Sequence, residues 1–262
     1  MPSRSGSEVA GVVSATRGNH GQSLAFAGRA YGRAVTILVP YGNSVEKNAA
    51  MRALGAEVIE FGDDFQEARE RSMEVASERA LEPVPPFHPD LVLGVATYAR
   101  ELFDAAGRLD TVYVPVGMGS GINALIAVRD LLGLDTKIVG VVSEKAPSTL
   151  LSFDRGEVVT TQAAATFVDG VATRSPDPVS IAGIVAGAAR VIAVSDDATA
   201  EAMRIVYRTT HNVAESAGAI GLAGLLSESL GQRGGRSAFV LCGGNVDSAQ
   251  FHEVLGGATP SP

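Results

Sequence analysis

Short apolar runs alternate with amphipathic segments along most of the chain, and this alternation limits the fold more than any other feature. Alternating strands and helices favour a mainly parallel sheet covered by helices on both faces. The first half predicts strands at residues 9–13, 34–39 and 57–61, and helices at 18–31, 45–54 and 64–80. The second half predicts strands at 112–116, 137–142, 191–194 and 238–241, and helices at 90–106, near 147–153, after 121, from 195 to 210 and at 215–230.

A proline-rich stretch, PVPPFHP at residues 83–89, interrupts this alternation. Proline fixes one backbone dihedral and lacks an N–H donor, so we expect no regular structure there. The predicted fold class is therefore α/β with two lobes, a small lobe at 11–97 and a large lobe at 98–262. Ligands of such folds bind at the carboxyl ends of the strands.

One strand of the second half runs directly into a glycine loop. The run VYVPV at 112–116 precedes Gly117, Gly119 and Gly121, with Ser120 among them. Glycine lets a backbone approach a ligand closely, and the first N–H groups of a helix lack internal partners. The loop therefore predicts a phosphate site. A tight turn without a ligand is the alternative, and the dinucleotide fingerprint G-x-G-x-x-G does not fit the spacing.

Composition excludes several classes of protein. The net charge of −8 without a basic cluster argues against nucleic-acid binding. No apolar run approaches the length of a membrane span or of a signal-peptide core. The single cysteine, Cys242, excludes an internal disulfide and favours a cytoplasmic location. The four histidines are too widely separated to show a metal-binding spacing.

Four motifs in a fixed order resemble the fold-type II pyridoxal-phosphate enzymes. They are SATRGNHGQ from Ser14, VGMGSG from Val116, ESAGA from Glu215 and LCGGNVD from Leu241. Further stretches such as GVATYARELF and VDGVATR also match. The resemblance extends over residues 12–247 and is strongest to the threonine/serine dehydratase (ammonia-lyase) branch. It implies two lobes with parallel sheets, similar to the β chain of tryptophan synthase, and pyridoxal 5′-phosphate as cofactor.

The resemblance also implies a role for each motif residue. The phosphate would be bound by Gly117, Met118, Gly119, Ser120 and Gly121. The pyridine ring would be contacted by Asn19, Gly170, Glu215 and Cys242, with Asn19 on its 3′ oxygen and Cys242 facing its nitrogen. The substrate carboxylate would be bound by Thr16, Gly18, Asn19 and His20. No metal ligand is implied.

Each of these side chains also has a plain structural interpretation. Asn19 and Thr16 are typical helix caps, and Cys242 on its own predicts a small buried apolar residue. Glu215 would be an acid in the first turn of a helix, where it balances the helix dipole. The joint order of the motifs favours the functional interpretation.

The expected reaction follows from Cys242 and Arg17. A neutral thiol does not hold the pyridine nitrogen protonated as a carboxylate would, so the ring is a weaker electron sink and suits β-elimination. Threonine or serine is expected to lose water, and hydrolysis of the resulting enamine then takes up water and gives a 2-oxo acid and ammonia. Related racemases use a serine at the position of Arg17, so we expect little racemase activity.

The lysine that forms a Schiff base with the cofactor belongs, in this family, to an S/A-F-K-x-R-G segment before the SATRGNHGQ turn. No lysine precedes Ser14, so we assign no catalytic residue and expect the N-terminal part of the large lobe to be missing. Of the lysines present, we expect Lys47 and Lys137 at the surface. Lys145 alone follows a strand end near the predicted ligand crevice.

Three functions remain open at this point. The leading hypothesis is a pyridoxal-phosphate-dependent ammonia-lyase acting on a hydroxy-amino acid. An amino-acid racemase is the alternative within enzymes. A non-catalytic, truncated ligand-binding relative is the third, since the catalytic lysine is absent. The resemblance further implies a small amino-acid substrate and a homo-oligomer, because relatives are commonly dimers or tetramers.

Overall fold

A computed structural model describes residues 10–262, which form two compact units. Unit 1 extends to Pro86 and unit 2 begins at Phe87. We expected the division between residues 97 and 98. It falls earlier because helix α4 (Pro89–Ala106) packs along helix α5 (Ser120–Leu131), which belongs to unit 2.

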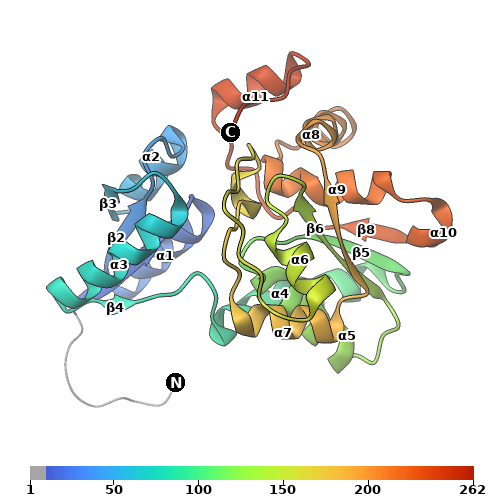
Figure 1. Cartoon of the computed structure of the whole chain (residues 1–262), viewed down its shortest axis with the longest axis horizontal. Helices are drawn as coiled ribbons and strands as arrows, with labels where there is room; N and C mark the ends of the chain where they lie inside the picture. The colour runs from blue at the N-terminus through green and yellow to red at the C-terminus, as the bar shows by residue number, and fades with distance from the viewer. Residues whose placement is uncertain (1–9) are drawn as a thin grey trace. The chain divides into compact units, whose positions relative to one another are not determined.

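Unit 1 contains a four-stranded parallel sheet in the order β3-β2-β1-β4 (Figure 1). Residues on alternate sides of β2 pack against different helices, as the two-residue period of a strand requires. Ile37 packs with α1 and α2, whereas Leu38 packs with α3. The strands are β1 (Gly11–Ala15), β2 (Ala34–Val39), β3 (Glu57–Glu60) and β4 (Glu82–Pro83), and the helices are α1 (Asn19–Tyr31), α2 (Val45–Ala53) and α3 (Phe65–Arg79).

The expectation that residues 83–89 form no regular structure is wrong at both ends, because Pro89 begins α4 and Pro83 belongs to a strand. Pro83 lies in β4, opposite Val13 of β1. This strand is at the edge of the sheet, where no further strand needs the N–H that proline lacks. The hydroxyl of Ser14 then donates to the carbonyl of Val84 over 2.7 Å. The start of the proline-rich stretch is thus fixed to unit 1.

Unit 2 repeats the strand order of unit 1, with a parallel sheet in the order β7-β6-β5-β8. The strands are β5 (Thr111–Pro115), β6 (Lys137–Ser143), β7 (Arg190–Val194) and β8 (Ser237–Phe239). Counted within its own unit, each sheet has the order 3-2-1-4. The chain therefore changes direction across the sheet beside β1 in unit 1 and beside β5 in unit 2. These are the positions at which open α/β sheets bind ligands.

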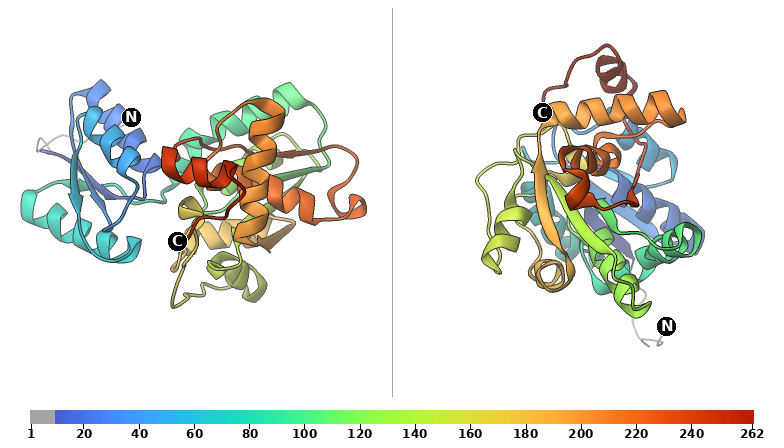
Figure 2. Two further views of the ribbon diagram at one scale, coloured as in Figure 1. Left: turned by 90° about the horizontal axis from the view of Figure 1, so that it is seen from above. Right: turned by 90° about the vertical axis from the view of Figure 1, so that its right-hand side faces the viewer.

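Helices cover both faces of the unit 2 sheet. Val112 and Val114 point toward α4, α5 and α7 (Pro178–Gly187), whereas Tyr113 points toward α8 (Asp196–Thr210) and α9 (Ser216–Ser227). Figures 1 and 2 show α9 alongside the strands. The other helical segments are α6 (Ser148–Arg155), a short 3₁₀ turn at Asp169–Val171, α10 (Leu230–Arg233) and α11 (Ser248–Leu255). Helices α7, α10 and α11 were not predicted.

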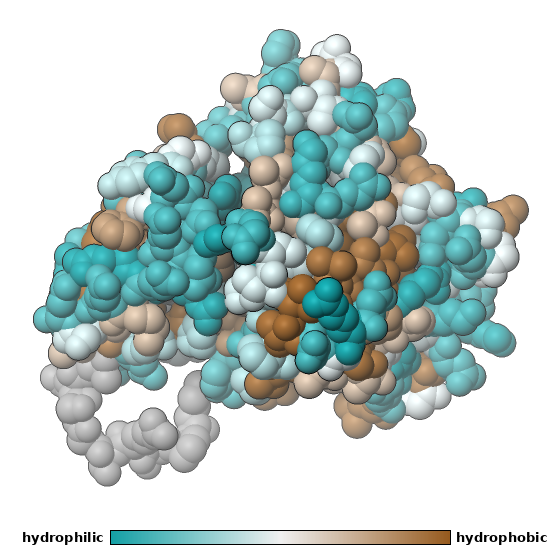
Figure 3. Space-filling view, in the orientation of Figure 1, coloured by the Kyte–Doolittle hydropathy of each residue, from teal (hydrophilic) through white to brown (hydrophobic). Residues whose placement is uncertain are grey.

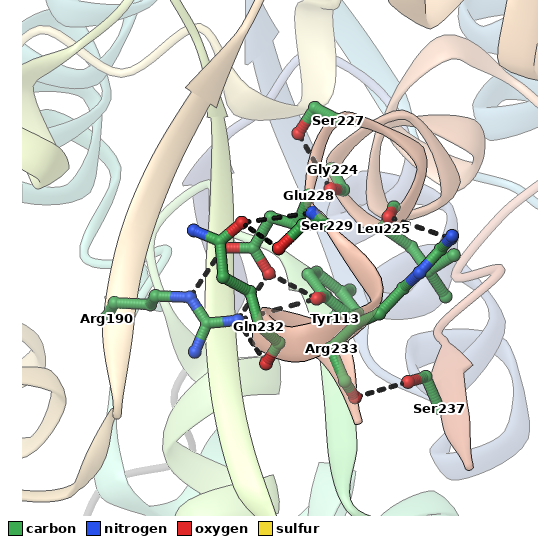
Figure 4. A network of polar contacts seen from close by, with 10 residues as sticks. All are labelled: Tyr113, Arg190, Gly224, Leu225, Ser227, Glu228, Ser229, Gln232, Arg233 and Ser237. Carbon is green, nitrogen blue, oxygen red and sulfur yellow. Dashed lines mark hydrogen bonds and ion pairs between the residues drawn. The ribbon is translucent and has the colours of Figure 1, made fainter. Parts of the chain in front are cut away.

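A buried polar network fixes one end of this sheet (Figure 4). The hydroxyl of Tyr113 donates to the carboxylate of Glu228, which also accepts from Arg190, with Nε of Arg190 2.6 Å from Oε1. Arg190 begins β7, so the network lies toward the amino ends of the strands. It connects two strands to the residue that ends α9.

The molecular face in Figure 3 is mainly hydrophilic, with apolar residues gathered in one area of unit 2. Among residues 10–262, no helix is both long enough and apolar enough to cross a bilayer.

Candidate active site

The glycine loop lies at the carboxyl end of β5 and leads into α5. Within the described part of the chain, none of the backbone N–H groups from Gly117 to Ile122 has a protein acceptor; Asn123 is the first residue whose N–H bonds back, to the carbonyl of Gly119. Such a run of unpartnered donors at a helix amino terminus favours an anion. The structure therefore places unpartnered donors at the loop where the sequence predicts a phosphate site.

The shape of the loop depends on Gly119, whose φ of +94° is a conformation that favours glycine. A β-carbon here would overlap the hydroxyl of Ser180, in the first turn of α7. Asn123 holds this arrangement, because its side-chain nitrogen donates to the Gly119 carbonyl over 2.8 Å and lies 3.1 Å from Oγ of Ser180.

The glycines of the loop serve packing within the protein as well as ligand approach. A β-carbon on Gly117 would overlap the carbonyl oxygen of Gly170. At Gly121 a β-carbon would meet only an ordinary contact, 3.5 Å from the Tyr98 hydroxyl. The expectation that glycine is needed for a ligand is thus incomplete at Gly117 and Gly119, where the protein itself occupies the space.

Three of the four residues predicted to contact the cofactor ring belong to unit 2, namely Gly170, Glu215 and Cys242, whereas Asn19 lies in unit 1. Gly170 lies against Ala217 of α9, since a β-carbon on Gly170 would stand 2.7 Å from that of Ala217. The thiol of Cys242 donates to the Ala217 carbonyl over 3.6 Å. The backbone N–H of Glu215 donates to the carbonyl of Gly243 over 3.1 Å. Contacts therefore run from Gly117 through Gly170 and Ala217 to Cys242.

The structure decides against one plain structural interpretation, that of Cys242, whereas Glu215 does stand at the amino end of a helix, where an acid balances the dipole. Cys242 is exposed and not the buried apolar residue that a lone cysteine predicts. Glu215 is buried and precedes the first residue of α9, but its side chain makes no capping bond to that helix. Neither observation assigns a role, and both leave the predicted positions beside the cofactor open.

Unit 1 carries the turn predicted to bind the substrate carboxylate. Thr16 accepts a hydrogen bond from the backbone N–H of Gly18 over 2.9 Å, and no side chain caps α1 at Gly18. The interpretation of Thr16 and Asn19 as helix caps is therefore wrong. Asn19 is exposed at the first position of α1.

The side chain of His20 is used within unit 1. Its Nε2 lies 3.2 Å from Oγ of Ser14, whose own proton goes to Val84. Nε2 therefore carries the hydrogen and donates it. Burial lowers the pKa of His20 from 6.5 to about 4, so the ring is neutral at physiological pH.

The lysines differ from expectation in one case. Lys47 is buried, 5% exposed, and its aliphatic stem lies where a β-carbon of Gly18 would be. Lys137 is exposed at the start of β6, as expected. It therefore lies at the amino ends of the strands, whereas the glycine loop lies at their carboxyl ends. Lys145 follows β6, and its ammonium nitrogen is 3.0 Å from the buried carboxylate of Asp196.

Sequence reasoning missed the side chains that shape the loop from behind. Tyr98 of α4 donates its hydroxyl to the Gly121 carbonyl over 3.0 Å, and Ser180 and Asn123 hold Gly119. Tyr98 stands in the stretch GVATYARELF that carried part of the resemblance, but nothing local places it beside the loop. In the residues described, no group of three or more His, Cys, Asp or Glu side chains is arranged to hold a metal ion.

Comparison with known proteins assigns the chain to a family. A family model described as "Pyridoxal-phosphate dependent enzyme" matches residues 3–243. The chain belongs to this family, and the predicted cofactor class is confirmed. L-threonine ammonia-lyase of Thermotoga maritima is 32% identical over 246 residues, which are 94% of this chain and 61% of that protein. L-threo-3-hydroxyaspartate ammonia-lyase of a Pseudomonas species is 32% identical over 95% of this chain and 78% of its own length.

Solved structures confirm the predicted fold class. The processed form of threonine deaminase isoform 2 from Solanum lycopersicum matches with a TM-score of 0.85 at 28% identity, over 94% of this chain and 73% of that one. A pyridoxal 5′-phosphate-dependent aspartate racemase matches with a TM-score of 0.86 at 26% identity, over 93% and 76%. The chain spans 61% of the length of the threonine ammonia-lyase that it resembles.

Proposed function

We propose that this chain binds pyridoxal 5′-phosphate and contributes to an ammonia-lyase that removes water and then ammonia from a hydroxy-amino acid. The observation that carries the proposal is the run of unpartnered N–H groups from Gly117 to Ile122, with Gly170, Glu215 and Cys242 gathered in the same unit. The likeness to ammonia-lyases at 32% identity supports the reaction class.

The residues present fit the phosphate and the ring of this cofactor. The loop at 117–121 would hold the phosphate, and Gly170, Glu215 and Cys242 would border the ring, with Asn19 as the predicted partner of its 3′ oxygen. When bound, pyridoxal phosphate supplies a sink for the electron pair released at the substrate α-carbon. A neutral Cys242 thiol adds no negative charge near the ring nitrogen, which favours elimination over reactions that need a long-lived charge.

Substrate recognition is assigned to the turn of unit 1. Thr16, Gly18, Asn19 and His20 would present donors to the substrate carboxylate. The neutral ring of His20 is committed to Ser14, so this residue contributes through its backbone and by holding the turn to β1. Threonine, serine and 3-hydroxyaspartate are the substrates to test, since each has a hydroxyl on the β-carbon.

A non-catalytic binding protein is the second candidate, and the lysines favour it. Lys137 lies at the amino end of β6, away from the glycine loop, and Lys145 is paired with Asp196. We further propose a cytoplasmic location and a homo-oligomer, from the single cysteine and from the resemblance, respectively.

Borohydride reduction separates the two candidates. The purified 262-residue chain is mixed with pyridoxal phosphate and reduced, and its intact mass and peptides are measured. A stoichiometric adduct on one lysine, together with 2-oxo acid formed from threonine or serine, supports a catalyst. Binding of pyridoxamine 5′-phosphate without an adduct supports the binding protein. A chain that binds neither cofactor form contradicts the proposed function.

The racemase alternative has its own test, which rests on Arg17. We expect amino acid recovered after incubation with the chain, its cofactor and deuterium oxide to keep its original configuration. Chiral chromatography measures this directly. Efficient inversion would contradict the expectation that a chain with Arg17 at this position has little racemase activity.

A further inference from the structure

Tyr98 contacts the phosphate loop from α4, whereas Ser180 contacts it from α7. It lies on α4, and its hydroxyl donates to the Gly121 carbonyl over 3.0 Å. This bond is the one side-chain bond to the first turn of α5 from α4 among the described residues. Since α4 packs along α5, the partly buried ring of Tyr98 packs against the apolar core of unit 2.

The bond acts on a peptide group that faces the predicted anion. The carbonyl of Gly121 and the N–H of Ile122 belong to one planar peptide unit and point in opposite directions. A hydroxyl fixed on the carbonyl therefore fixes the direction of that N–H, which has no protein acceptor. It also polarises the amide, which makes the N–H a stronger donor.

The Tyr98 hydroxyl keeps its proton under all ordinary conditions. Burial raises the pKa of Tyr98 above its usual value, and a negative charge on nearby Cys242 would raise it further. The group is thus a permanent donor, and it lies in the same neighbourhood as the thiol that is predicted to face the ring nitrogen.

We propose that Tyr98 is a positioning residue for the cofactor phosphate, acting through the Gly121 carbonyl on the Ile122 N–H. This inference rests on the proposed function, because it assumes that the loop at 117–121 binds a phosphate. It deepens that function by naming a side chain that no motif residue includes. Tyr98 tunes affinity for the phosphate and leaves the affinity for the unphosphorylated ring unchanged.

The test compares Tyr98→Phe with Tyr113→Phe in the full chain. Both variants lose one buried tyrosine hydroxyl in unit 2, but Tyr113 bonds to Glu228 at the other end of the sheet. Calorimetric titration measures binding of pyridoxamine 5′-phosphate and of pyridoxamine. We expect Tyr98→Phe to lower the affinity for pyridoxamine 5′-phosphate about fivefold, which is the effect of one neutral hydrogen bond. The affinity for pyridoxamine should not change. Tyr113→Phe should leave both affinities unchanged.

Two results would overturn the proposal. One is equal binding of pyridoxamine 5′-phosphate by wild type and Tyr98→Phe, and the other is an equal loss for both ligands. If the wild-type chain binds no pyridoxamine 5′-phosphate, the proposed function fails, and amide hydrogen exchange without ligand decides on Tyr98 alone. Exchange at the Asn123 N–H, which bonds to the Gly119 carbonyl, should rise in Tyr98→Phe and not in Tyr113→Phe. Unchanged exchange in Tyr98→Phe would reject the positioning role.

Discussion

Gly119 is constrained both by its backbone and by its neighbour. Its φ of +94° disfavours any side chain, and a β-carbon would overlap the Ser180 hydroxyl. Gly133 follows the other end of α5 with a φ of +62° and open space around it. A comparison of alanine substitutions at Gly119 and Gly133 therefore separates the effect of backbone strain from the effect of steric overlap.

We predict that Gly119→Ala lowers the free energy of unfolding by about 2–3 kcal/mol and weakens pyridoxamine 5′-phosphate binding at least tenfold, because both strain and overlap displace the loop. Gly133→Ala should cost about 1 kcal/mol from strain and leave binding unchanged. Urea unfolding and calorimetric titration measure the two effects. Equal losses of binding in both variants would contradict the role of Ser180.

Glu228 is the residue on which the Figure 4 network depends. Burial acts to raise its pKa, but hydrogen bonds from Arg190 and Tyr113 outweigh burial and hold the pKa below its usual value. The stability from such a group is present above the unfolded-state pKa and is lost as pH falls through the lower folded-state pKa. Burial, followed by the hydrogen bond to Glu228 and the charge of that carboxylate, raises the pKa of Tyr113 to about 12, although Arg190 acts in the opposite direction.

We predict that Glu228→Gln lowers the free energy of unfolding at pH 7 by about 2 kcal/mol, because Arg190 loses a largely buried partner. The wild type should lose this advantage as pH falls below 4.5 and through the lower folded-state pKa, so the two unfolding curves should converge in acid. Glu60→Gln is the control, since Glu60 pairs with Arg52 over 3.5 Å with both side chains nearly half exposed. A difference between wild type and Glu228→Gln that persists in acid would contradict the assignment.

At this scale the sequence predicted the phosphate loop but not the residues that support it. A glycine loop after a strand is a local pattern, readable from neighbouring residues. Tyr98 and Ser180 reach the loop from α4 and α7, so their contacts depend on helix packing that no local pattern contains. Lys47 was misplaced for the same reason, because the surface that buries it is the turn at Gly18.

At the scale of elements, the amino end of α8 is joined to two other segments by one carboxylate. Asp196, the first residue of α8, accepts from Ser143 at the end of β6 over 3.1 Å and from Thr166 over 2.5 Å. The ammonium group of Lys145 also pairs with this carboxylate. Ser195 caps the helix by accepting from the N–H of Ala198.

We predict that Asp196→Ala lowers the free energy of unfolding by about 3 kcal/mol, since it leaves buried hydroxyls without their acceptor. Ser195→Ala should cost about 1 kcal/mol, the usual value of a helix cap. Because the segment from Thr166 leads to Gly170 beside the loop, Asp196→Ala should also weaken pyridoxamine 5′-phosphate binding, and Ser195→Ala should not. Thermal unfolding and calorimetry distinguish these effects. Unchanged binding in Asp196→Ala would reject the link to the loop.

Most strands and amphipathic helices were predictable within a few residues, and the exceptions have physical causes. Helix α7, PVSIAGIVAG, is apolar on all sides, so it lacks the period that marks an amphipathic helix. Strand β4 is two residues long and contains Pro83, which local rules exclude from strands. It exists because the edge of the unit 1 sheet accepts it.

At the scale of the whole molecule, two sheets with one strand order carry two parts of the predicted site. The turn at Thr16 follows β1, and the glycine loop follows β5, which are equivalent strands in the order 3-2-1-4. Both motifs therefore lie at the switch point of their own sheet. The two motifs thus follow equivalent strands, at the positions where the topology of an open α/β sheet favours ligand binding.

The two units should respond to acid at different pH values. In unit 1, burial lowers the pKa of His20 from 6.5 to about 4. Its contribution to stability is complete above pH 6.5 and is lost as pH falls toward 4, because the unfolded chain takes up the proton first. In unit 2, the Glu228 pKa lies below its usual value of 4.5, so this contribution is lost only at lower pH.

We therefore predict that lowering the pH from 7 to 5 destabilises unit 1 by on the order of 1–2 kcal/mol and leaves unit 2 nearly unchanged. Pulse proteolysis in urea, with peptides mapped by mass spectrometry, measures each unit separately. His20→Gln is the matched variant, since its amide still donates to Ser14 but does not titrate. Its unit 1 should show no such loss between pH 7 and 5. An equal loss in wild type and His20→Gln would assign the acid sensitivity of unit 1 to another group.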